Sequence, residues 1–435
     1  MGIRVLQVHP GLVPPPKDPE RAEYYFIRDN ISGDILLPTW AKTADELRNQ
    51  LGSFPTYKVN NFTYHMALEG PHPYGTLRQK WHVFRFQLLT GLKLGRSQRY
   101  DCVKSYGSGL TGLVSVLLSK LLRTKLIVEL PGAPEDTYKY ARFGDSYRYA
   151  ATPDLVTRLA KIASNLVLKI VILSADRVQL LYSWQLQAFP QLQKVPASVV
   201  HIFSTVSKVP VGKDEDGSVL LVGAPWFVKG VDVLIRAWRQ IEHEFPAGRL
   251  RILGYFPEED MLRQMAGDST QIEFLKARPN PETLQLIAHC SIFVLASRTE
   301  GTPRVFIEAM AAGKPVVGSD VGGVRTLVRD GVNGFLFDSE NSDQLAGKLR
   351  LLLSSPELRR RFGEAGRQIA LKELDELTFG SQLSDMIEDT IYERGPGYEK
   401  DLQPGQPDGA AAEPPRESDA DESFSSGASA ASTAT

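Results

Sequence analysis

Residues 297–323 read SRTEGTPRVFIEAMAAGKPVVGSDVGG, and this stretch combines the signals of a strand, a loop and a helix. An apolar run ends at Ala296, which predicts a buried strand, and a polar loop follows at the edge where open α/β sheets bind ligands. Thr302 is a predicted helix N-cap with Pro303 in the first helical position, and Gly313 is predicted to end the helix. The stretch therefore predicts a strand–loop–helix unit whose loop binds a ligand.

The polar groups of this unit suit one kind of ligand. Glu300 lies in the loop and Glu308 lies about one and a half turns into the helix, so both carboxylates can reach a molecule that crosses the helix N-terminus. The first helical amides, near Arg304 and Val305, form an anion site with the positive end of the helix dipole. A nucleotide-sugar has the matching parts, because it offers a diphosphate to the amides and sugar hydroxyls to the carboxylates.

The second half of the chain alternates between apolar runs, Gly-marked turns and helical patterns. This alternation indicates βαβ units and a parallel, doubly wound sheet, with helices on both faces. The predicted strands are Val219–Val222, Leu250–Leu253, Ser291–Ala296, Pro315–Gly318 and Gly334–Phe337.

The first half is less regular but of the same kind. Its predicted strands are Ile3–Val8, Asp34–Pro38, Asp101–Ser105, Lys125–Leu130, Arg177–Tyr182 and Ser198–Phe203, and residues 155–173 are predicted as a helix. Residues 207–217 hold Pro, Gly and charges without apolar periodicity, which predicts a domain boundary.

The predicted organisation therefore has four parts. Residues 1–208 form one domain and residues 209–375 a second one. Apolar residues at helical spacing predict that residues 376–394 form a helix. Residues 395–435 are rich in Pro, Gly, Ala, Ser and acidic residues, so this tail is predicted to be disordered.

Net charge and cysteine content indicate the kind of partner and the compartment of the protein. The net charge is −1, of which residues 395–435 contribute −6, leaving +5 on residues 1–394. This mild basicity favours an anionic ligand or surface, and no nucleic-acid partner is expected. Cys102 and Cys290 show no metal-ligand spacing and are predicted to be small buried apolar residues in a reducing compartment. No signal peptide or spanning segment is predicted, so a cytoplasmic protein is expected, soluble or peripheral on the inner face of a membrane.

The glutamates lie in the pattern E-G-x6-E-A-M-A-x-G-x-P-V-V, which is followed by D-V-G-G and G-x-N-G. This pattern resembles the family 4 retaining glycosyltransferases of the GT-B fold. The run VGAPWFVKG at residues 222–230 resembles the first C-domain strand of that family and its pyrophosphate-binding lysine loop. The resemblance is specific over residues 217–340 and becomes one of general layout over residues 1–216. It implies an α/β chain with two Rossmann-like domains, whose parallel sheets face each other across a cleft. Residues 1–208 would form the acceptor-side domain and residues 209–375 the donor-binding domain, and the helix of residues 376–394 would pack back toward the first domain.

The resemblance also implies roles for single residues. Glu300 would bind hydroxyls of the donor sugar, Glu308 would bind the ribose, and Lys229 would neutralise the leaving diphosphate. No metal and no cofactor are expected, because fixed positive charges replace the cation at the leaving group of a nucleotide-diphosphate sugar. The other predicted donor-binding residues are Gly223, Gly301, Thr302, Arg304 and Val305.

Three positions depart from the family's pattern. The family usually has an arginine five residues before the lysine, whereas this chain has Ala224; Arg298 and Arg304 are candidates to replace that phosphate contact. Residues 9–16 read HPGLVPPP in place of a glycine-rich loop, and residues 129–132 read ELPG where the family often has a histidine. His9 is a candidate catalytic substitute for that histidine, the alternative being a structural histidine. The acceptor-side candidates are Gly11, Glu129, Pro131 and Gly132.

Residues 76–100 hold six basic residues and no acidic ones, namely Arg78, Lys80, Arg85, Lys93, Arg96 and Arg99. Leu77, Trp81, Phe84, Leu88 and Leu92 fall on one helical stripe, a pattern typical of a basic helix on anionic lipid. The alternative is a core-facing helix with a basic solvent face, and two glycines at 91 and 95 weaken the prediction of a helix.

Together these patterns predict a retaining glycosyltransferase that moves a sugar from a nucleotide-sugar to a carbohydrate or lipid-linked acceptor, with an anionic membrane surface as a further partner. Two alternatives stay open: a non-catalytic nucleotide-sugar-binding subunit, and another GT-B enzyme such as an epimerase or a phosphorylase. A nicotinamide dehydrogenase is disfavoured, because residues 7–12 read QVHPGL where G-x-G-x-x-G is expected.

Overall fold

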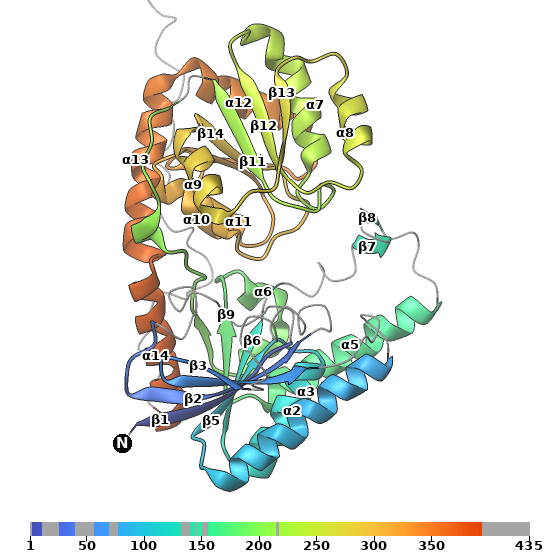
Figure 1. Ribbon diagram of the computed structural model, residues 1–435, viewed down its shortest axis with the longest axis vertical. Helices are drawn as coiled ribbons and strands as arrows, with labels where there is room; N and C mark the ends of the chain where they lie inside the picture. The colour runs from blue at the N-terminus through green and yellow to red at the C-terminus, as the bar shows by residue number, and fades with distance from the viewer. Residues whose placement is uncertain are drawn as a thin grey trace, which may run out of the picture. The chain divides into compact units, whose positions relative to one another are not determined.

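The computed structural model describes residues 2–10, 26–39, 56–68, 77–130, 132, 140–143, 146–149, 155–214 and 217–393. The predicted disordered tail and the candidates Gly11 and Pro131 lie outside these residues. The described residues form two large sheets with helices packed on them (Figure 1). The predicted α/β architecture with parallel sheets is confirmed.

The first sheet has eight strands in the order β10-β9-β6-β5-β1-β2-β4-β3, and all neighbouring pairs are parallel except β3 with β4. We call it sheet A. Its strands are β1 (Ile3–Val8), β2 (Ile31–Thr39), β3 (Thr56–Val59), β4 (Phe62–Leu68), β5 (Cys102–Tyr106), β6 (Lys125–Leu130), β9 (Arg177–Leu180) and β10 (Ala197–Val199). Its helices are α2 (Leu77–Ser97), α3 (Leu110–Leu122), α5 (Leu155–Ser174) and α6 (Gln185–Ala188), while β7 (Tyr140–Phe143) and β8 (Ser146–Tyr149) form a separate hairpin.

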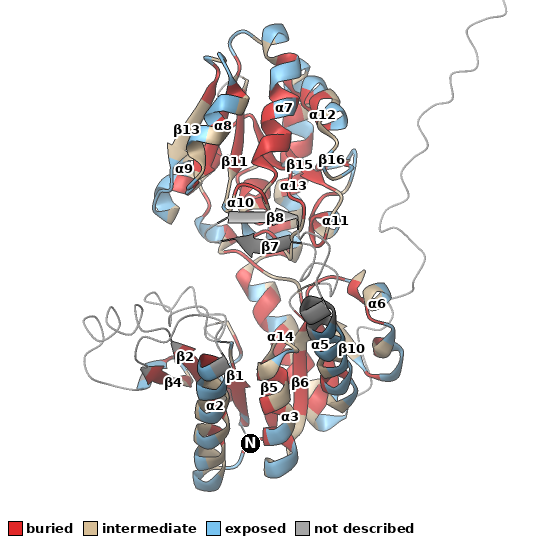
Figure 2. Ribbon diagram, turned by 90° about the vertical axis from the view of Figure 1, so that its right-hand side faces the viewer, coloured by how far each residue is buried: buried red, intermediate tan, exposed pale blue. Residues whose placement is uncertain are grey.

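The second sheet, sheet C, has six parallel strands in the order β13-β12-β11-β14-β15-β16. Its strands are β11 (Ser218–Val222), β12 (Arg249–Gly254), β13 (Ile272–Lys276), β14 (Ile292–Leu295), β15 (Val316–Ser319) and β16 (Gly334–Phe337). The helices are α7 (Val231–Ile241), α8 (Glu259–Ala266), α9 (Asn280–His289), α10 (Arg304–Ala311), α11 (Val324–Leu327), α12 (Ser342–Ser354), α13 (Pro356–Glu373) and α14 (Glu376–Tyr392). Figure 2 shows the buried strands of this sheet under helices whose outer faces are exposed.

Most predicted strands match observed ones closely, but three strands of the two large sheets and both strands of the separate hairpin, β7 and β8, were missed. β3 and β4 carry polar residues among their apolar ones, and β13 reads IEFLK, so none forms a continuous apolar run. Both β3 and β13 lie at sheet edges, where one side of the strand is unpaired and polar residues are tolerated. The predicted run 198–203 is strand only at its start, because β10 ends at Val199.

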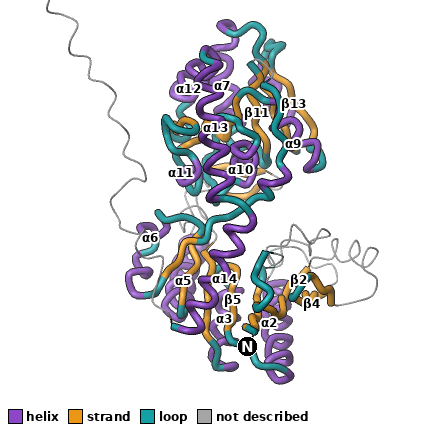
Figure 3. The backbone as a smooth tube through the Cα atoms, turned by 90° about the vertical axis from the view of Figure 1, so that its left-hand side faces the viewer, coloured by secondary structure: helices purple, strands orange, loops and turns teal. Residues whose placement is uncertain are grey.

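Helix α14 packs on sheet A although it follows the residues of sheet C (Figure 3). Phe379, Leu383 and Ile387 belong to the same buried cluster as residues of β1 and β2. Gly380 permits this contact, because a Cβ there would lie 2.1 Å from the carbonyl oxygen of Phe26. The last described helix is therefore part of the core of the first sheet.

Helices α2 and α3 make close contact through two glycines. A Cβ at Gly91 would lie 2.8 Å from Leu118, and a Cβ at Gly95 would lie 2.3 Å from Leu122. The glycines that weaken the helix in isolation thus permit its packing on α3, a case in which tertiary contact overrides propensity. Phe84, one residue of the predicted stripe, packs against the core of sheet A.

Both cysteines are buried and unpaired, which agrees with the prediction. Burial raises the pKa of the Cys102 thiol well above its ordinary value. None of the helices in the described part of the chain combines the length and apolar character needed to cross a bilayer.

We expect α14 to contribute to the stability of sheet A. Leu383 is fully buried, so Leu383→Ala should lower the free energy of unfolding by about 2–5 kcal/mol and the melting temperature by several degrees. The control is Leu377→Ala in the same helix, where the side chain is 71% exposed and the change should stay within about 0.5 kcal/mol. Equal melting temperatures for the two variants, measured by circular dichroism, would contradict this role.

Candidate functional site

Two glycines shape the loop that joins β11 to α7. Gly223 has a φ of 147°, and a Cβ there would lie 3.0 Å from Cε of Lys229, so the lysine side chain packs across this glycine. Gly230 has a φ of 63°, and a Cβ there would lie 1.8 Å from the carbonyl oxygen of Ala296. Only glycine fits both the dihedral angle and the contact. The start of α7 is therefore held against the end of β14.

This approach brings two predicted site residues together. Lys229 Nζ donates a hydrogen bond to Glu300 Oε1, and Ser297 Oγ donates to the same oxygen at 2.8 Å. The Glu300 side chain is 9% exposed and that of Lys229 is 18% exposed, so the ion pair is shielded from bulk water without being sealed off. A charge-assisted hydrogen bond in such a setting fixes the orientation of both side chains.

Gly322 and Gly323 support the loop that carries Glu300. Gly322 has a φ of 48°, and a Cβ there would lie 1.7 Å from the carbonyl oxygen of Glu300. Gly323 N donates to the carbonyl oxygen of Gly301 at 2.7 Å. Trp184, which sequence reasoning missed, donates from Nε1 to the carbonyl oxygen of Gly322 at 2.8 Å. The glycine pair thus has a packing function beyond that of a turn.

The start of α10 differs by one residue from its prediction. Pro303 is the N-cap and Arg304 the first helical residue, so the prediction of Thr302 as N-cap is wrong. Thr302 Oγ1 is buried and makes no hydrogen bond. Arg304 is exposed, with its guanidinium carbon 5.4 Å from the centre of the Phe203 ring. Val305, the next residue, is partly buried against the core of sheet C.

Glu308 lies on the buried side of α10. It is 9% exposed, and Ser204 Oγ donates a hydrogen bond to its Oε1 at 3.3 Å. Ser204 follows β10 of sheet A, so this contact joins residues 104 positions apart. Buried carboxylates require hydrogen-bond donors, and Ser204 is one such donor, so Glu308 is not a freely solvated helix residue.

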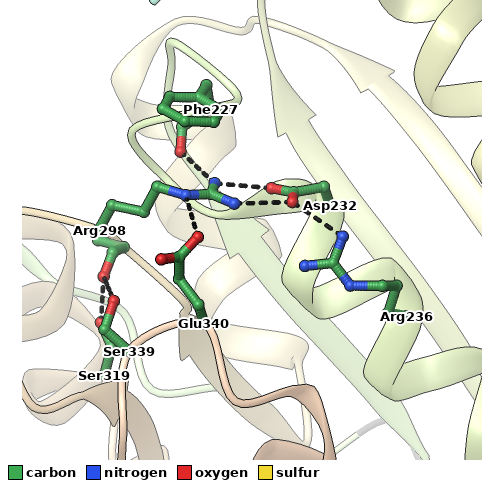
Figure 4. Close-up of polar contacts among 8 residues, drawn as sticks. Phe227, Asp232, Arg236, Arg298, Ser319, Ser339 and Glu340 are labelled. Atoms are coloured by element: carbon green, nitrogen blue, oxygen red, sulfur yellow. Dashed lines mark hydrogen bonds and ion pairs between the residues drawn. The ribbon is translucent and has the colours of Figure 1, made fainter. Parts of the chain in front are cut away.

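Arg298 has a different environment from the one predicted (Figure 4). Its guanidinium makes two hydrogen bonds of 2.8 Å to the carboxylate of Asp232 and one of 2.6 Å to the carbonyl oxygen of Phe227. Its Nε donates to Glu340 at 3.0 Å. These partners occupy most of its donors, so the geometry argues against a phosphate contact and assigns Arg298 to the support of the loop.

The charge of Asp232 depends on this arrangement. Burial raises the pKa of Asp232, but its hydrogen bonds to Arg298 and the charge of that arginine outweigh burial and hold the pKa below its ordinary value. Arg236, one turn along α7, makes a further contact of 3.1 Å and is far more exposed. Asp232 is therefore ionised at neutral pH and balances the buried guanidinium.

His9 lies in a cluster of polar residues at the carboxyl edge of sheet A. The His9 ring stacks on the Tyr106 ring, with 3.8 Å between the ring centres. Lys104 Nζ lies 3.5 Å from the centre of the Tyr106 ring. Burial, together with the charge of Lys104, lowers the pKa of His9 to about 3. His9 is thus neutral and a weak base at neutral pH, which makes proton transfer a poor fit for it, while its catalytic role stays a prediction.

Two acceptor-side candidates, Glu129 and Gly132, lie at or just after the end of the neighbouring strand β6. Glu129 pairs with Lys104 at 2.9 Å, and the lysine side chain is 1% exposed. Gly132 accepts a hydrogen bond of 3.4 Å from Gln185, which also bonds to Leu130. Lys104 was missed, although a lysine inside the apolar strand CVKSY is itself a signal of a buried charge with a partner. Among the described residues, no group of three or more His, Cys, Asp or Glu side chains gathers as a metal site.

We expect the Arg298–Asp232 pair to act on stability. Asp232→Asn removes the buried carboxylate and leaves the guanidinium the more exposed Glu340 as an anionic partner, so it should cost about 3–5 kcal/mol at neutral pH, measured by urea unfolding. Because the folded pKa is depressed, the advantage of the wild type over this variant should be complete above about pH 4 and disappear as the pH falls through the folded pKa. The control, Arg236→Gln, removes an exposed partner and should cost at most about 1 kcal/mol. Equal losses in the two variants would refute this role.

Comparison with known proteins shows which family this part of the chain resembles. The family model described as "Glycosyl transferases group 1" matches residues 205–369, which include sheet C, Lys229, Glu300 and Glu308. An uncharacterized glycosyltransferase of Methanocaldococcus jannaschii is 27% identical over 76% of this chain and 87% of its own length. The GDP-mannose-dependent alpha-(1-6)-phosphatidylinositol monomannoside mannosyltransferase of Mycolicibacterium smegmatis is 31% identical, over 37% of this chain and 44% of its own length. The chain thus spans less than half of this second relative.

Solved structures show the same fold. Sucrose-phosphate synthase from Thermosynechococcus elongatus superposes with a TM-score of 0.70 at 16% identity, covering 91% of this chain and 100% of that one. Anabaena HepE, solved in complex with UDP, superposes with a TM-score of 0.63 at 20% identity, covering 89% and 100%. The resemblance drawn from the sequence is therefore confirmed: residues 205–369 match the group 1 glycosyl transferases, and the chain has the GT-B fold of the glycosyltransferases that it resembles.

Proposed function

We propose that the chain transfers a sugar from a nucleotide-diphosphate sugar to a carbohydrate or lipid-linked acceptor, with retention of the anomeric configuration and without a metal. One observation carries this proposal: the predicted leaving-group cation, Lys229, contacts the predicted sugar ligand, Glu300. A diphosphate and its sugar are joined by one bond, so their protein ligands must lie side by side. Lys229 and Glu300 meet that requirement although they are 71 residues apart.

The charges at this edge of sheet C support departure of a diphosphate. An ammonium group has three donors, so Lys229 can contact phosphate oxygens while it keeps its bond to Glu300. The first amides of α10 add the positive end of a helix dipole. Arg304 is exposed at this helix start and is the remaining candidate for the phosphate contact that Ala224 lacks. Such fixed charges act where negative charge develops, which is how a site without a metal stabilises the transition state.

The proposed reaction exchanges one bond of the donor sugar for another. The bond from the anomeric carbon to the diphosphate oxygen breaks, and a bond to the acceptor hydroxyl oxygen forms on the same face of the sugar. The acceptor proton passes to the departing diphosphate. The weak basicity of His9 is consistent with this route, since a histidine with a pKa of about 3 is a poor proton acceptor at neutral pH.

The acceptor and the location are further parts of the proposal. Glu129 and Gly132 lie at the carboxyl end of β6, where acceptor hydroxyls would contact sheet A. A cytoplasmic protein that associates peripherally with an anionic membrane would meet lipid-linked acceptors at the inner face. The mannosyltransferase relative is named for a phosphatidylinositol mannoside, which agrees with such an acceptor.

A ligand panel and a product assay test the proposal together. Thermal shifts with UDP-, GDP-, ADP- and dTDP-sugars identify the nucleotide, because a ligand that binds the folded state raises the melting temperature. Transfer of labelled sugar to a lipid or oligosaccharide extract then reports catalysis. A donor that binds without hydrolysis or transfer would favour the non-catalytic binding subunit, and release of sugar phosphate would favour a phosphorylase.

We expect Glu308 and Glu300 to act on different parts of the donor. Glu308→Gln should weaken free nucleotide diphosphate and intact donor alike, because the ribose contact is the same in both. Glu300→Gln should leave the affinity for nucleotide diphosphate nearly unchanged and lower kcat by roughly ten- to a hundred-fold, since a charge-assisted hydrogen bond is worth about 1.5–3 kcal/mol. The measurements are calorimetric affinities and steady-state rates.

A matched control for both variants is Glu273→Gln, which removes a partly exposed carboxylate on the edge strand β13 and should change neither quantity. If Glu300→Gln weakens free nucleotide binding as much as Glu308→Gln does, the proposed placement of the donor is wrong.

A further inference from the structure

The outer face of α5 is apolar where a solvent-facing helix is normally polar. Five of its large side chains are 44–65% exposed and recur three or four residues apart, so they lie on one face of the helix, namely Leu159, Ile162, Leu166, Ile170 and Leu173. On the opposite face Val171 and Ile172 are fully buried in the core of sheet A. A helix with apolar residues on both faces is expected to contact a second apolar environment besides the protein core.

The neighbouring helices extend this apolar face. Helix α3 packs against both α5 and α2, so the three helices lie side by side (Figure 1). On α3, Leu117 and Leu121 are 42% and 61% exposed, and on α2, Trp81 and Leu89 are 61% and 56% exposed. Figure 2 shows exposed residues along the outer sides of α2, α3 and the described part of α5. Such a collection of exposed large apolar side chains marks an interaction surface.

The charge of this three-helix face is of one sign. The sequences of α2, α3 and α5 contain no aspartate and no glutamate. Among the side chains whose exposure the structure describes, the exposed basic ones are Arg78, Lys80, Arg85, Lys93 and Arg96 on α2, Lys120 on α3 and Lys169 on α5. A second copy of this chain would present the same cationic face, and like charges would repel. A surface that combines apolar groups with negative charge is complementary to it.

We propose that the three-helix face docks on an anionic lipid bilayer, with the apolar row of α5 inserted at the boundary between headgroups and acyl chains. The basic residues of α2 and α3 then meet the lipid phosphates. This inference changes the role of α2, whose predicted stripe packs largely against the core, since Phe84, Leu88 and Leu92 contact the core of sheet A. The docking itself does not depend on the proposed function. Only its biological role, which is to bring the enzyme to a lipid-linked acceptor, rests on that function.

The test is flotation of the full chain with vesicles of phosphatidylcholine, with and without phosphatidylglycerol. We expect binding to the anionic vesicles that weakens as salt is added. The double variant Ile162→Glu/Leu166→Glu should bind at least about tenfold more weakly, because it removes two apolar side chains and adds like charge to the lipid. The matched control is Leu351→Glu/Leu377→Glu, which changes two leucines of similar exposure, 53% and 71%, on α12 and α14 and should bind like the wild type.

Three outcomes would overturn the inference. The wild type fails to bind anionic vesicles, the α5 variant binds as well as its control, or light scattering shows a dimer that only the α5 variant dissociates. Melting temperatures and nucleotide affinity, measured without vesicles, should be equal in the α5 variant and its control. Because neither readout requires transfer, failure of the membrane surface and failure of the proposed glycosyl transfer are distinguished.

Discussion

The arrangement of the site depends on the ion pairs and hydrogen bonds of the buried Arg298 guanidinium. This guanidinium joins the loop after β14 to the first turn of α7 through Asp232 and to the segment after β16 through Glu340. A buried charge costs several kcal/mol unless it is paired and its donors are satisfied. These partners satisfy the guanidinium in only one geometry. Because Arg298 lies two residues before Glu300, this geometry favours one conformation of the loop that begins at residue 297.

Close backbone contacts add a second constraint at the same edge of sheet C. Gly230 lies against the carbonyl oxygen of Ala296, and Gly322 lies against that of Glu300. Neither contact leaves room for a Cβ, so both segments are fixed by sterics in addition to charge. The consequence is chemical: Lys229 and Glu300 come within hydrogen-bond distance at the start of α10. A cation and a carboxylate held in place before a ligand arrives need little reorganisation when charge develops on that ligand.

Local patterns predicted much of the fold and part of the site. Inner strands of a sheet are largely buried and read as mainly apolar runs, so β1 and β6 were predicted with their observed ends. Glu300 was predicted in the loop and Glu308 in the helix that follows it. Both predictions were possible because the two residues are only eight positions apart within one strand–loop–helix unit. Edge strands such as β13 were missed, since an edge strand mixes polar with apolar residues and has no unbroken run.

The sequence by itself determined the parallel α/β architecture and the residues that carry the predicted chemistry, because both follow from short-range spacing. The tertiary structure alone decided the role of Arg298, whose side-chain partners lie 66 and 42 residues away and leave no trace in its local sequence. It also decided which helix presents apolar side chains to the outside. The stripe on α2 and the row on α5 have the same periodicity, and only packing against sheet A buries much of the first while leaving the second exposed.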